Sequence, residues 1–434
     1  MAQTYFATTL PGLEEALQLE LRAMRCKHTQ IVSGGVEFEA TRKGLYTALY
    51  TTRCAHRILL RLDDFRAGDL FTLHRKTQRI EWSRYLPPHA PLQLHITSHR
   101  SRLHSRDAIE RTLIEALQDA LPKAPPIPSR SLEDDASPHL SSDEANLPDK
   151  TNPSRSLQNA DASPPPRSLQ NADASPYPRS AQQDSPFGLW VRVEEDRCTL
   201  SFDATGPLLY QRGWRTATGE APLRESIACA LLWLLGWTPT QPLVDPVCGS
   251  GTFLIEAARL QAALPPRLPR PYLVQRWPDF DPALWEEVLH APLLLPRWKA
   301  RNPPSTEPSQ LWGFDHDPNV IGYAKQNALR AEVSALTQFS TRSLDALLPP
   351  ASTTGFLIAN PPYGRRLSRK TPQQKGAEQV LLRRFADHFT GWQMGLLLPR
   401  DITPQHPALQ AQEIARFRNG GFPVTFWRLS HPSS

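Results

Sequence analysis

The segment LIANPPYGRRL, residues 357–367, places an amide, two prolines and a tyrosine directly after a short apolar run. An extruded nucleobase with an exocyclic NH2 needs two hydrogen-bond acceptors to keep its nitrogen lone pair aimed at an electrophile. The side-chain oxygen of Asn360 and the backbone carbonyl of Pro361 can supply them. Pro361 and Pro362 restrict φ and so fix the direction of these carbonyls, while Tyr363 offers a ring for stacking. The alternative is a simple turn in a proline-rich chain.

A glycine-rich turn follows a second apolar run, in VDPVCGSGTFLIEAARL at residues 244–260. Gly249 and Gly251 let the backbone approach a ligand closely, and the helix that starts near Thr252 offers free N–H donors. The third glycine of a dinucleotide fingerprint is absent, since Leu254 stands in its place. A nicotinamide or flavin site is therefore disfavoured. The remaining alternative is a plain strand-to-helix turn.

Acidic residues end successive predicted strands. Asp245 precedes the glycine turn and can pair with an ammonium group, and Asp315 in LWGFDHDP can accept hydrogen bonds from ribose hydroxyls. Asp317 is a secondary candidate, and Asp345 can accept from the exocyclic amine of adenine. Each acid alone is more typical of a loop or a helix cap, but their order favours a pocket for S-adenosylmethionine. The predicted cofactor-binding residues are Asp245, Pro246, Gly249, Ser250, Gly251, Thr252, Asp315, Asp317, Asp345 and Asn360.

Short apolar runs separated by helical patterns must position these residues. QPLVDPV, LWGFD, GFLIAN and QMGLLLP are typical of parallel strands covered on both faces, and predict a doubly wound α/β domain over residues 206–434. The N-terminal part is predicted to be α+β. TYFATTL, GGVEFEA and PLQLHITSH are expected strands, LYTALYTTRCAHRILLRL is expected to form a helix followed by a strand, and SRDAIERTLIEALQDAL is an expected amphipathic helix.

A low-complexity tract interrupts this pattern at about residues 123–185. Within it RSLQNADASPPP, residues 155–166, recurs as RSLQNADASPYP, residues 167–178. The repeats lack an apolar face on which to stack, so a disordered insertion is predicted, with an interaction tract as the alternative. The alternating pattern returns in GLWVRVEEDRCTLSFD, which predicts two paired strands and places the insertion inside a domain.

Composition narrows the class of protein. A chain of 434 residues favours two or three domains. Its net charge is +6, with arginine in large excess over lysine. A polyanionic partner explains this charge, and a compositional bias toward arginine in a GC-rich genome explains it equally well. Five separated cysteines without a CxxC pair argue against a disulfide framework or a zinc ribbon. With neither a signal peptide nor a spanning segment, we expect a soluble cytoplasmic protein that does not contact a membrane.

Histidine and arginine are frequent in residues 95–106, and arginine recurs after the NPPY segment. His95 and His99 lack the glutamate of an HExxH zinc motif, so we expect no metal site. Arg100, Arg102 and Arg106 form a predicted RNA-facing loop, for which a solvated charged surface is an equal alternative. Arg365 and Arg366 follow the NPPY segment and are suited to phosphates near the target base.

The motifs DPVCGSGTFLIEAA, GFDHDPNVIGYAKQNA and ANPPYGRRL resemble motifs I, II and IV of class I S-adenosylmethionine-dependent methyltransferases that modify exocyclic base amines. Further segments, among them YFATTLPGLEEAL, YQRGWRTATGEAPLRESIACALL and NGGFPVTFWRL, are similar to the bacterial 23S rRNA guanine-N2 methyltransferases, in the form with a single methyltransferase domain. The resemblance covers nearly the whole chain apart from the repeat insertion.

The resemblance implies a ferredoxin-like region at residues 1–70, a THUMP RNA-binding domain at 71–205 and a Rossmann-like methyltransferase domain at 206–434. It also implies cofactor contacts by the acids and glycines named above, and target-base contacts by Asn360, Pro361 and Tyr363. We expect N2 methylation of a guanine in 23S rRNA, free or in an assembly intermediate, without a metal or an obligatory oligomer. The alternatives are a tRNA guanine-N2 or adenine-N6 methyltransferase, a non-catalytic ribosome-assembly protein and, less favoured, a DNA adenine methyltransferase.

Overall fold

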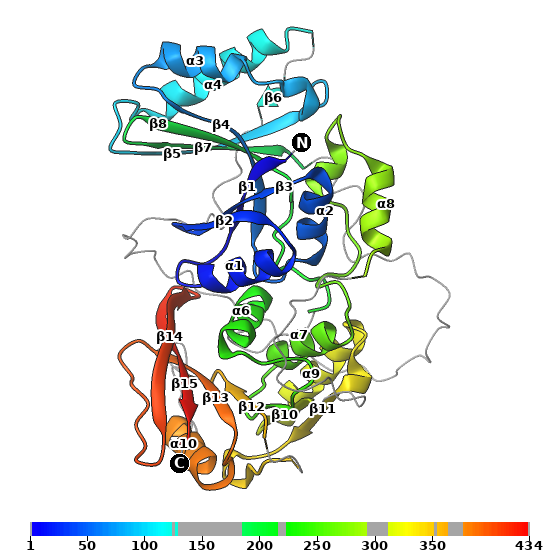
Figure 1. Ribbon diagram of the computed structural model, residues 1–434, viewed down its shortest axis with the longest axis vertical. Helices are drawn as coiled ribbons and strands as arrows, with labels where there is room; N and C mark the ends of the chain where they lie inside the picture. Colours follow the sequence, from blue (N-terminus) through cyan, green and yellow to red (C-terminus); the bar gives the residue numbers. More distant parts are fainter. Residues whose placement is uncertain are drawn as a thin grey trace, which may run out of the picture.

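A computed structural model describes residues 2–123, 126–128, 185–215, 223–292, 311–350, 354–362 and 376–432. Within these ranges the chain forms two sheets, one in each half of an elongated molecule (Figure 1). The first sheet has the strand order β2-β3-β1-β4-β8-β7-β5-β6, and the second has the order β11-β10-β9-β12-β13-β15-β14. A mixed α/β architecture, as predicted from the sequence, is confirmed.

The first sheet is built from residues 3–203. Its strands are β1 (Gln3–Thr8), β2 (Lys27–Val32), β3 (Gly35–Ala40), β4 (Arg57–Arg66), β5 (Pro91–His99), β6 (Ile127–Pro128), β7 (Phe187–Glu194) and β8 (Arg197–Asp203). The strand β4 pairs with β1 through its first residues and with β8 from Leu59 to Arg66. A single sheet therefore runs across residue 70, where the sequence predicts a domain boundary, and that boundary stays a prediction.

Helices cover one face of this sheet. They are α1 (Glu14–Ala23), α2 (Arg42–Thr51), α3 (Leu70–Gln78) and α4 (Arg106–Ala120), with the short 3-10 helix η1 (Trp82–Arg84). Alternation along β7 explains the packing, because Leu189, Val191 and Val193 are buried while Arg192 is not. The expected helix at 105–121 and the paired strands β7 and β8 are confirmed. The strands β2 and β6 were not predicted, and β6 pairs with β5 inside the range assigned to the insertion.

The second sheet contains five parallel strands and an antiparallel hairpin at one edge. Its strands are β9 (Leu243–Asp245), β10 (Leu311–Asp315), β11 (Thr337–Thr341), β12 (Phe356–Ala359), β13 (Gln393–Pro399), β14 (Gln410–Asn419) and β15 (Phe422–Ser430). From β9 the chain proceeds through β10 to β11 on one side, and it then crosses to β12 on the other side. Such a reversal creates a crevice at the carboxyl ends of the strands, where ligands bind in this class of fold.

Both faces of the second sheet are covered. The covering helices are α6 (Glu225–Leu235), α7 (Thr252–Gln261), α9 (Pro318–Arg330) and α10 (Ala377–His388), with the 3-10 helices η3 (Ser334–Leu336) and η4 (Leu344–Ala346). The helix α8 (Pro282–His290) and the 3-10 helix η2 (Leu273–Arg276) lie against the N-terminal half instead. Leu243 and Ile358 belong to the core shared with α6 and α7, whereas Val244 and Leu357 belong to a core shared with α10. Continuous apolar runs are therefore required, as predicted for buried parallel strands.

Buried charges join the two halves. Arg53, from the N-terminal half, lies 3.5 Å from Glu256 on α7, and Arg212 lies 3.1 Å from the same carboxylate. Burial acts to raise the pKa of Glu256, but Arg212 and Arg53 outweigh it and hold the pKa below its usual range. A second contact places α8 beside α2 (Figure 1), with Asp279 bonded to Arg42. The halves therefore meet through specific buried pairs as well as apolar packing.

Candidate active site

Two predicted acids lie at adjacent strand ends of the second sheet. Asp245 ends β9 and is 2% exposed, and Asp315 ends β10, which pairs in parallel with β9. The glycine turn after β9 passes over the end of β10, because Gly249 donates its N–H to Asp315 Oδ2 at 3.1 Å. Cys248 also donates its N–H to the carbonyl of Phe314 at 2.8 Å. The structure therefore brings the glycine turn and the two acids together.

The two glycines of the turn have different roles. Both have positive φ, +53° at Gly249 and +86° at Gly251, a region that favours glycine. A Cβ at Gly251 would lie 2.9 Å from the ring of Phe339, so the missing side chain is needed for packing. A Cβ at Gly249 would meet nothing within 4 Å. Gly249 consequently presents backbone to open space, as expected for a ligand-binding turn.

Asp245 lies in an unfavourable electrostatic environment. Burial raises the pKa of its carboxyl group well above the usual range; the N–H of Val247, 3.2 Å away, opposes this, and the Asp315 carboxylate adds to it. No cation pairs with Asp245 among the described residues. A buried carboxylate of this kind gains most from a positively charged group brought close to it.

Asn360 directly follows β12, which pairs with β9 and therefore ends at the same edge. Its Oδ1 atom is buried and has no hydrogen-bond partner among the described residues. Buried polar atoms are nearly always paired, so an unpaired acceptor points to a ligand donor. Pro361 is buried and Pro362 is exposed, whereas Tyr363, Arg365 and Arg366 lie outside the described residues.

The other two predicted acids lie in more ordinary positions. Asp317 caps helix α9 by accepting from the N–H of Asn319 at 2.8 Å, and it also donates its own N–H to Asp315 Oδ1. Asp345 is in η4, where its side chain is 75% exposed and 3.6 Å from Arg383 on α10. The structure thus keeps Asp317 next to Asp315, and it places Asp345 at the periphery with a cation already beside it.

Arg215 was missed by the sequence analysis. Its guanidinium donates to Thr252 Oγ1 at 2.9 Å, to Glu225 Oε1 at 3.0 Å and to the carbonyl of Leu223 at 2.8 Å. It therefore holds the first residue of α7, just after the glycine turn, against the start of α6. An isolated arginine carries no spacing pattern. The only signal for Arg215 in the sequence is its place within the family-like segment YQRGWRTATGEAPLRES. Arg215 is a positioning residue for the turn.

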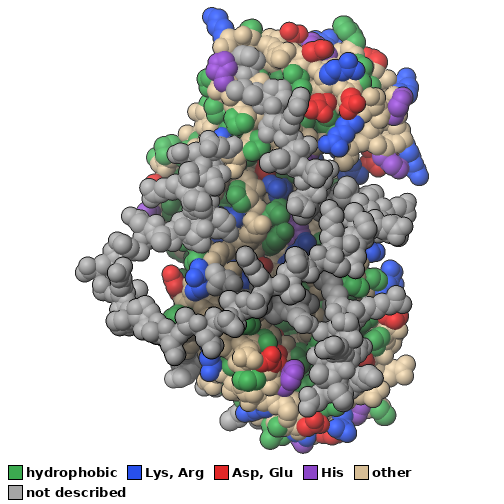
Figure 2. Space-filling view, turned by 180° about the vertical axis from the view of Figure 1, so that it is seen from behind, with side chains coloured by type: hydrophobic (Ala, Val, Ile, Leu, Met, Phe, Trp, Pro, Cys, Tyr) green, Lys and Arg blue, Asp and Glu red, His purple; other side chains and the backbone are tan. Residues whose placement is uncertain are grey.

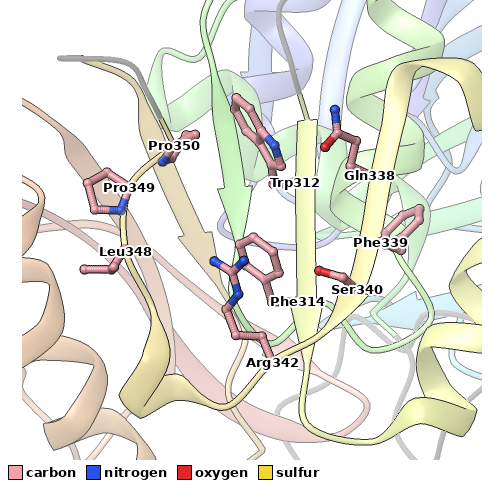
Figure 3. A pocket seen from close by; sticks show the side chains of 9 residues that line it. All are labelled: Trp312, Phe314, Gln338, Phe339, Ser340, Arg342, Leu348, Pro349 and Pro350. Carbon is pink, nitrogen blue, oxygen red and sulfur yellow. The ribbon is translucent and has the colours of Figure 1, made fainter.

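A cavity of about 430 Å³ lies beside the strand ends (Figure 3). Trp312, Phe314 and Arg342 project between β10 and the segment that carries Leu348 and Pro349. The guanidinium of Arg342 stacks over the ring of Phe314 at 4.2 Å. The remaining lining residues are Gln338, Phe339, Ser340 and Pro350. The backbone N–H of Arg342 also bonds to the carbonyl of Asp315, so the cavity adjoins the acids without including them.

The predicted RNA-facing arginines lie in the other half of the molecule. Arg102 pairs with Asp196 at 2.8 Å, and Arg106 is the first residue of α4. The helices α3 and α4 lie at one end of the molecule, and β10 and β12 lie toward the other end (Figure 1). Because these arginines lie far from the strand ends of β10 and β12, a ligand that contacts both regions must be large.

Two family descriptions match this chain. Residues 212–416 match the "RMKL-like, methyltransferase domain", and residues 4–59 match the "RlmL ferredoxin-like domain". A curated protein of Synechocystis sp., named "Putative RNA methyltransferase slr0064", is 30% identical over 427 residues, covering 97% of this chain and 95% of that protein. The chain belongs to the RlmL-like family of S-adenosylmethionine-dependent RNA methyltransferases.

Solved structures agree with this family. A "possible methylase" from Clostridium difficile has a TM-score of 0.73 and 25% identity, with 100% of this chain and 99% of that chain covered. SMU.472, titled a methyltransferase "complexed with SAH", has a TM-score of 0.72 and 22% identity over 100% and 99% of the two chains. The second likeness concerns the fold, and it confirms the Rossmann-like architecture of the catalytic half of this methyltransferase.

The described residues of this methyltransferase contain neither a cluster of metal ligands nor a membrane-spanning helix. In the described ranges, no three His, Cys, Asp or Glu side chains gather as metal ligands would. Among the helices that the structure describes, none is long and apolar enough to cross a bilayer. The cysteines of these ranges are free thiols.

Proposed function

We propose that this methyltransferase modifies the exocyclic N2 amine of a guanine in 23S rRNA. The observation that carries the proposal is the buried Oδ1 of Asn360, an unpaired acceptor beside the strand ends of Asp245 and Asp315. An acceptor in that position suits an N–H donor of the target. The RNA methyltransferase name of the Synechocystis relative supports RNA as the substrate class.

Residues of this chain fit the cofactor. S-Adenosylmethionine supplies an electrophilic methyl group on a sulfonium, together with an ammonium, a carboxylate and an adenosine. In our proposal Asp245 binds the ammonium group, since its buried carboxylate lacks a cation of its own. Gly249 and Ser250 border the amino-acid end, Asp315 accepts from the ribose hydroxyls, and Asp345 serves the adenine. Pro246, Gly251, Thr252 and Asp317 shape the turn around these groups.

The target amine is held by acceptors from the strand β12. Asn360 Oδ1 and the carbonyl of Pro361 each accept one N–H of the amine, which leaves its lone pair free to point toward the methyl group. Pro361 and Pro362 fix the direction of the carbonyls through their restricted φ. Tyr363 is proposed to stack on the extruded base, and Arg365 and Arg366 to contact neighbouring phosphates. Acceleration in this scheme comes mainly from orientation of the two reacting groups.

The N-terminal half is proposed to bind the RNA. Residues 1–70 form the ferredoxin-like region and residues 71–205 the THUMP domain in this proposal, with residues 206–434 as the catalytic domain. Arg100, Arg102 and Arg106 are the proposed RNA contacts. Action on rRNA implies a cytoplasmic enzyme, acting on free 23S rRNA or on an assembly intermediate.

Mass mapping of modified nucleotides tests the proposal. Ribosomal and transfer RNA from cells lacking the gene are compared with RNA from wild-type cells, and the gene is then restored. We expect one N2-methylguanine of 23S rRNA to disappear and to return on complementation. A lost N6-methyladenine or a lost tRNA methylation would replace the substrate in the proposal, and unchanged RNA would favour a non-catalytic role.

A further inference from the structure

An exposed aromatic side chain lies at the end of the molecule that we propose to bind RNA. Phe71, in the first turn of α3, is 73% exposed. This is the highest value among the exposed large hydrophobic side chains of the described residues. The exposure of Phe71 follows from which face of α3 packs on the core. Leu73 and Thr77 are buried in the core, so Phe71 and Arg75 face outward. The cap at Asp69, which accepts from the N–H of Thr72 at 2.7 Å, fixes the start of the helix.

One arginine lies beside this ring, and others lie at the same end of the molecule. The Arg75 guanidinium lies 5.8 Å from the centre of the Phe71 ring, and Arg102 packs directly against Gly68 in the loop that leads into α3. Arg66 and Arg100 are exposed at the same end. Arg66, Arg75 and Arg100 make no ion pair with a described residue.

The acids at this end are largely engaged. Asp69 caps α3 through both carboxylate oxygens, and Asp196 binds Arg102 and Ser101. Glu195 is the exposed acid of the adjoining turn. Positive charge that is free to meet an anion therefore exceeds negative charge around Phe71. Figure 2 shows the opposite side of the molecule, where basic and acidic side chains of the described residues are interspersed at both ends.

We infer that Phe71 is a base-stacking residue for an unpaired nucleotide of the RNA substrate, with Arg75 beside it and Arg100 at the same end for the flanking phosphates. An exposed aromatic ring among arginines suits single-stranded RNA, because every base has a face that can stack and the backbone is anionic. The position at the end opposite the strand ends implies that the substrate spans both halves. The inference rests on the proposed action on RNA, and it names which RNA feature this surface takes.

Methyl-transfer kinetics on deproteinised 23S rRNA test this surface with four variants. Phe71→Ala and Phe71→Leu remove the ring, Phe71→Trp retains an aromatic ring, and Leu329→Ala removes a side chain of similar exposure, 68%, from α9. We expect the two ring-removing variants to raise KM for RNA by roughly 5-fold to 100-fold, the loss of one stacked base. Their kcat at saturating RNA should equal that of the wild type, as should both constants of the other two variants.

Three results would overturn the inference. Unchanged KM in Phe71→Ala would reject this surface alone, leaving the proposed activity intact. Unchanged KM together with a loss of self-association, measured by sedimentation, would assign Phe71 to an interface between copies of the chain. Wild-type protein that neither binds nor methylates 23S rRNA would reject the proposed function along with this surface. Photo-crosslinking of the peptide containing Phe71 to RNA bases gives independent support when it succeeds.

Discussion

The backbone N–H of Gly249 donates to Oδ2 of Asp315 at 3.1 Å, although the two residues are 66 positions apart. One Asp315 oxygen thus orders the glycine turn, and the other accepts from the N–H of Asp317. The proposed cofactor site is therefore organised from within before any ligand arrives. A ribose bound at Asp315 would meet a carboxylate that is already held in place.

Asp315→Ala is expected to weaken S-adenosylmethionine binding by about 10-fold or more, since hydrogen bonds to charged groups contribute roughly 1.5–3 kcal/mol each. Isothermal titration calorimetry measures the effect. Asp345→Ala is a matched comparison, because this acid is exposed and paired with Arg383, and a smaller loss is expected there. An Asp315→Ala protein with wild-type affinity would remove Asp315 from the site.

Cofactor affinity should rise with pH. Burial raises the pKa of Asp245 in the free protein, so its carboxyl group is protonated below that raised pKa and cannot pair with an ammonium group. Affinity is then expected to increase as the pH rises through this pKa and to level off above it. Asp245→Asn should give a weaker affinity with a flatter pH profile. The same slope in wild type and variant would assign the titration to another group.

Glu256→Ala should destabilise the protein by about 3–5 kcal/mol, because it leaves the buried Arg53 and Arg212 without their shared anion. Denaturant unfolding measures this loss. Glu287, on α8, offers a control from the other contact between the halves, since its pair with Lys43 has 60% and 52% exposed side chains. Glu287→Ala is expected to cost less than about 1 kcal/mol. Equal costs for the two variants would contradict a special role for the buried cluster.

His56 should make the fold sensitive to acid. Burial, with Arg224, Arg212 and Arg57 nearby, lowers its pKa from 6.5 to about 3, and its ring bonds to Ser226 at 3.0 Å. The unfolded chain binds the proton more readily, so stability present above pH 6.5 is lost as the pH falls toward 3. Between pH 6.5 and 4 the loss amounts to roughly 3 kcal/mol.

His56→Gln carries no titrating ring and should lose less stability over that interval. Urea unfolding of both proteins at several pH values provides the comparison. Parallel pH profiles would show that other groups cause the acid sensitivity.

The strand ends of the catalytic half could be predicted from the sequence. Each of β9, β10 and β12 is a short apolar run that stops at a polar residue, and burial on both faces requires that pattern. Asp245, Asp315 and Asn360 were found in this way, and the structure places them at one edge. Whether they bind cofactor and base stays a prediction.

Contacts between distant residues could not be predicted. Five arginines counted toward a basic surface are buried instead, namely Arg53, Arg212, Arg259, Arg267 and Arg270. Arginine excess in this chain is therefore partly a property of its interior. The packing of α8 on α2 likewise depends on tertiary contacts such as that between Tyr46 and Trp285. A periodic pattern shows which face of a helix is buried, but it does not show what covers that face.

The proposed role of Asn360 in holding the target amine is tested by the initial rate of methyl transfer to 23S rRNA by the Asn360→Ala variant. Because Oδ1 of Asn360 has no partner in the described protein, its loss should leave stability unchanged. We expect the rate to fall by about 10²-fold or more, with affinity for S-adenosylmethionine within about 3-fold of the wild type. A variant that methylates RNA at the wild-type rate would contradict it.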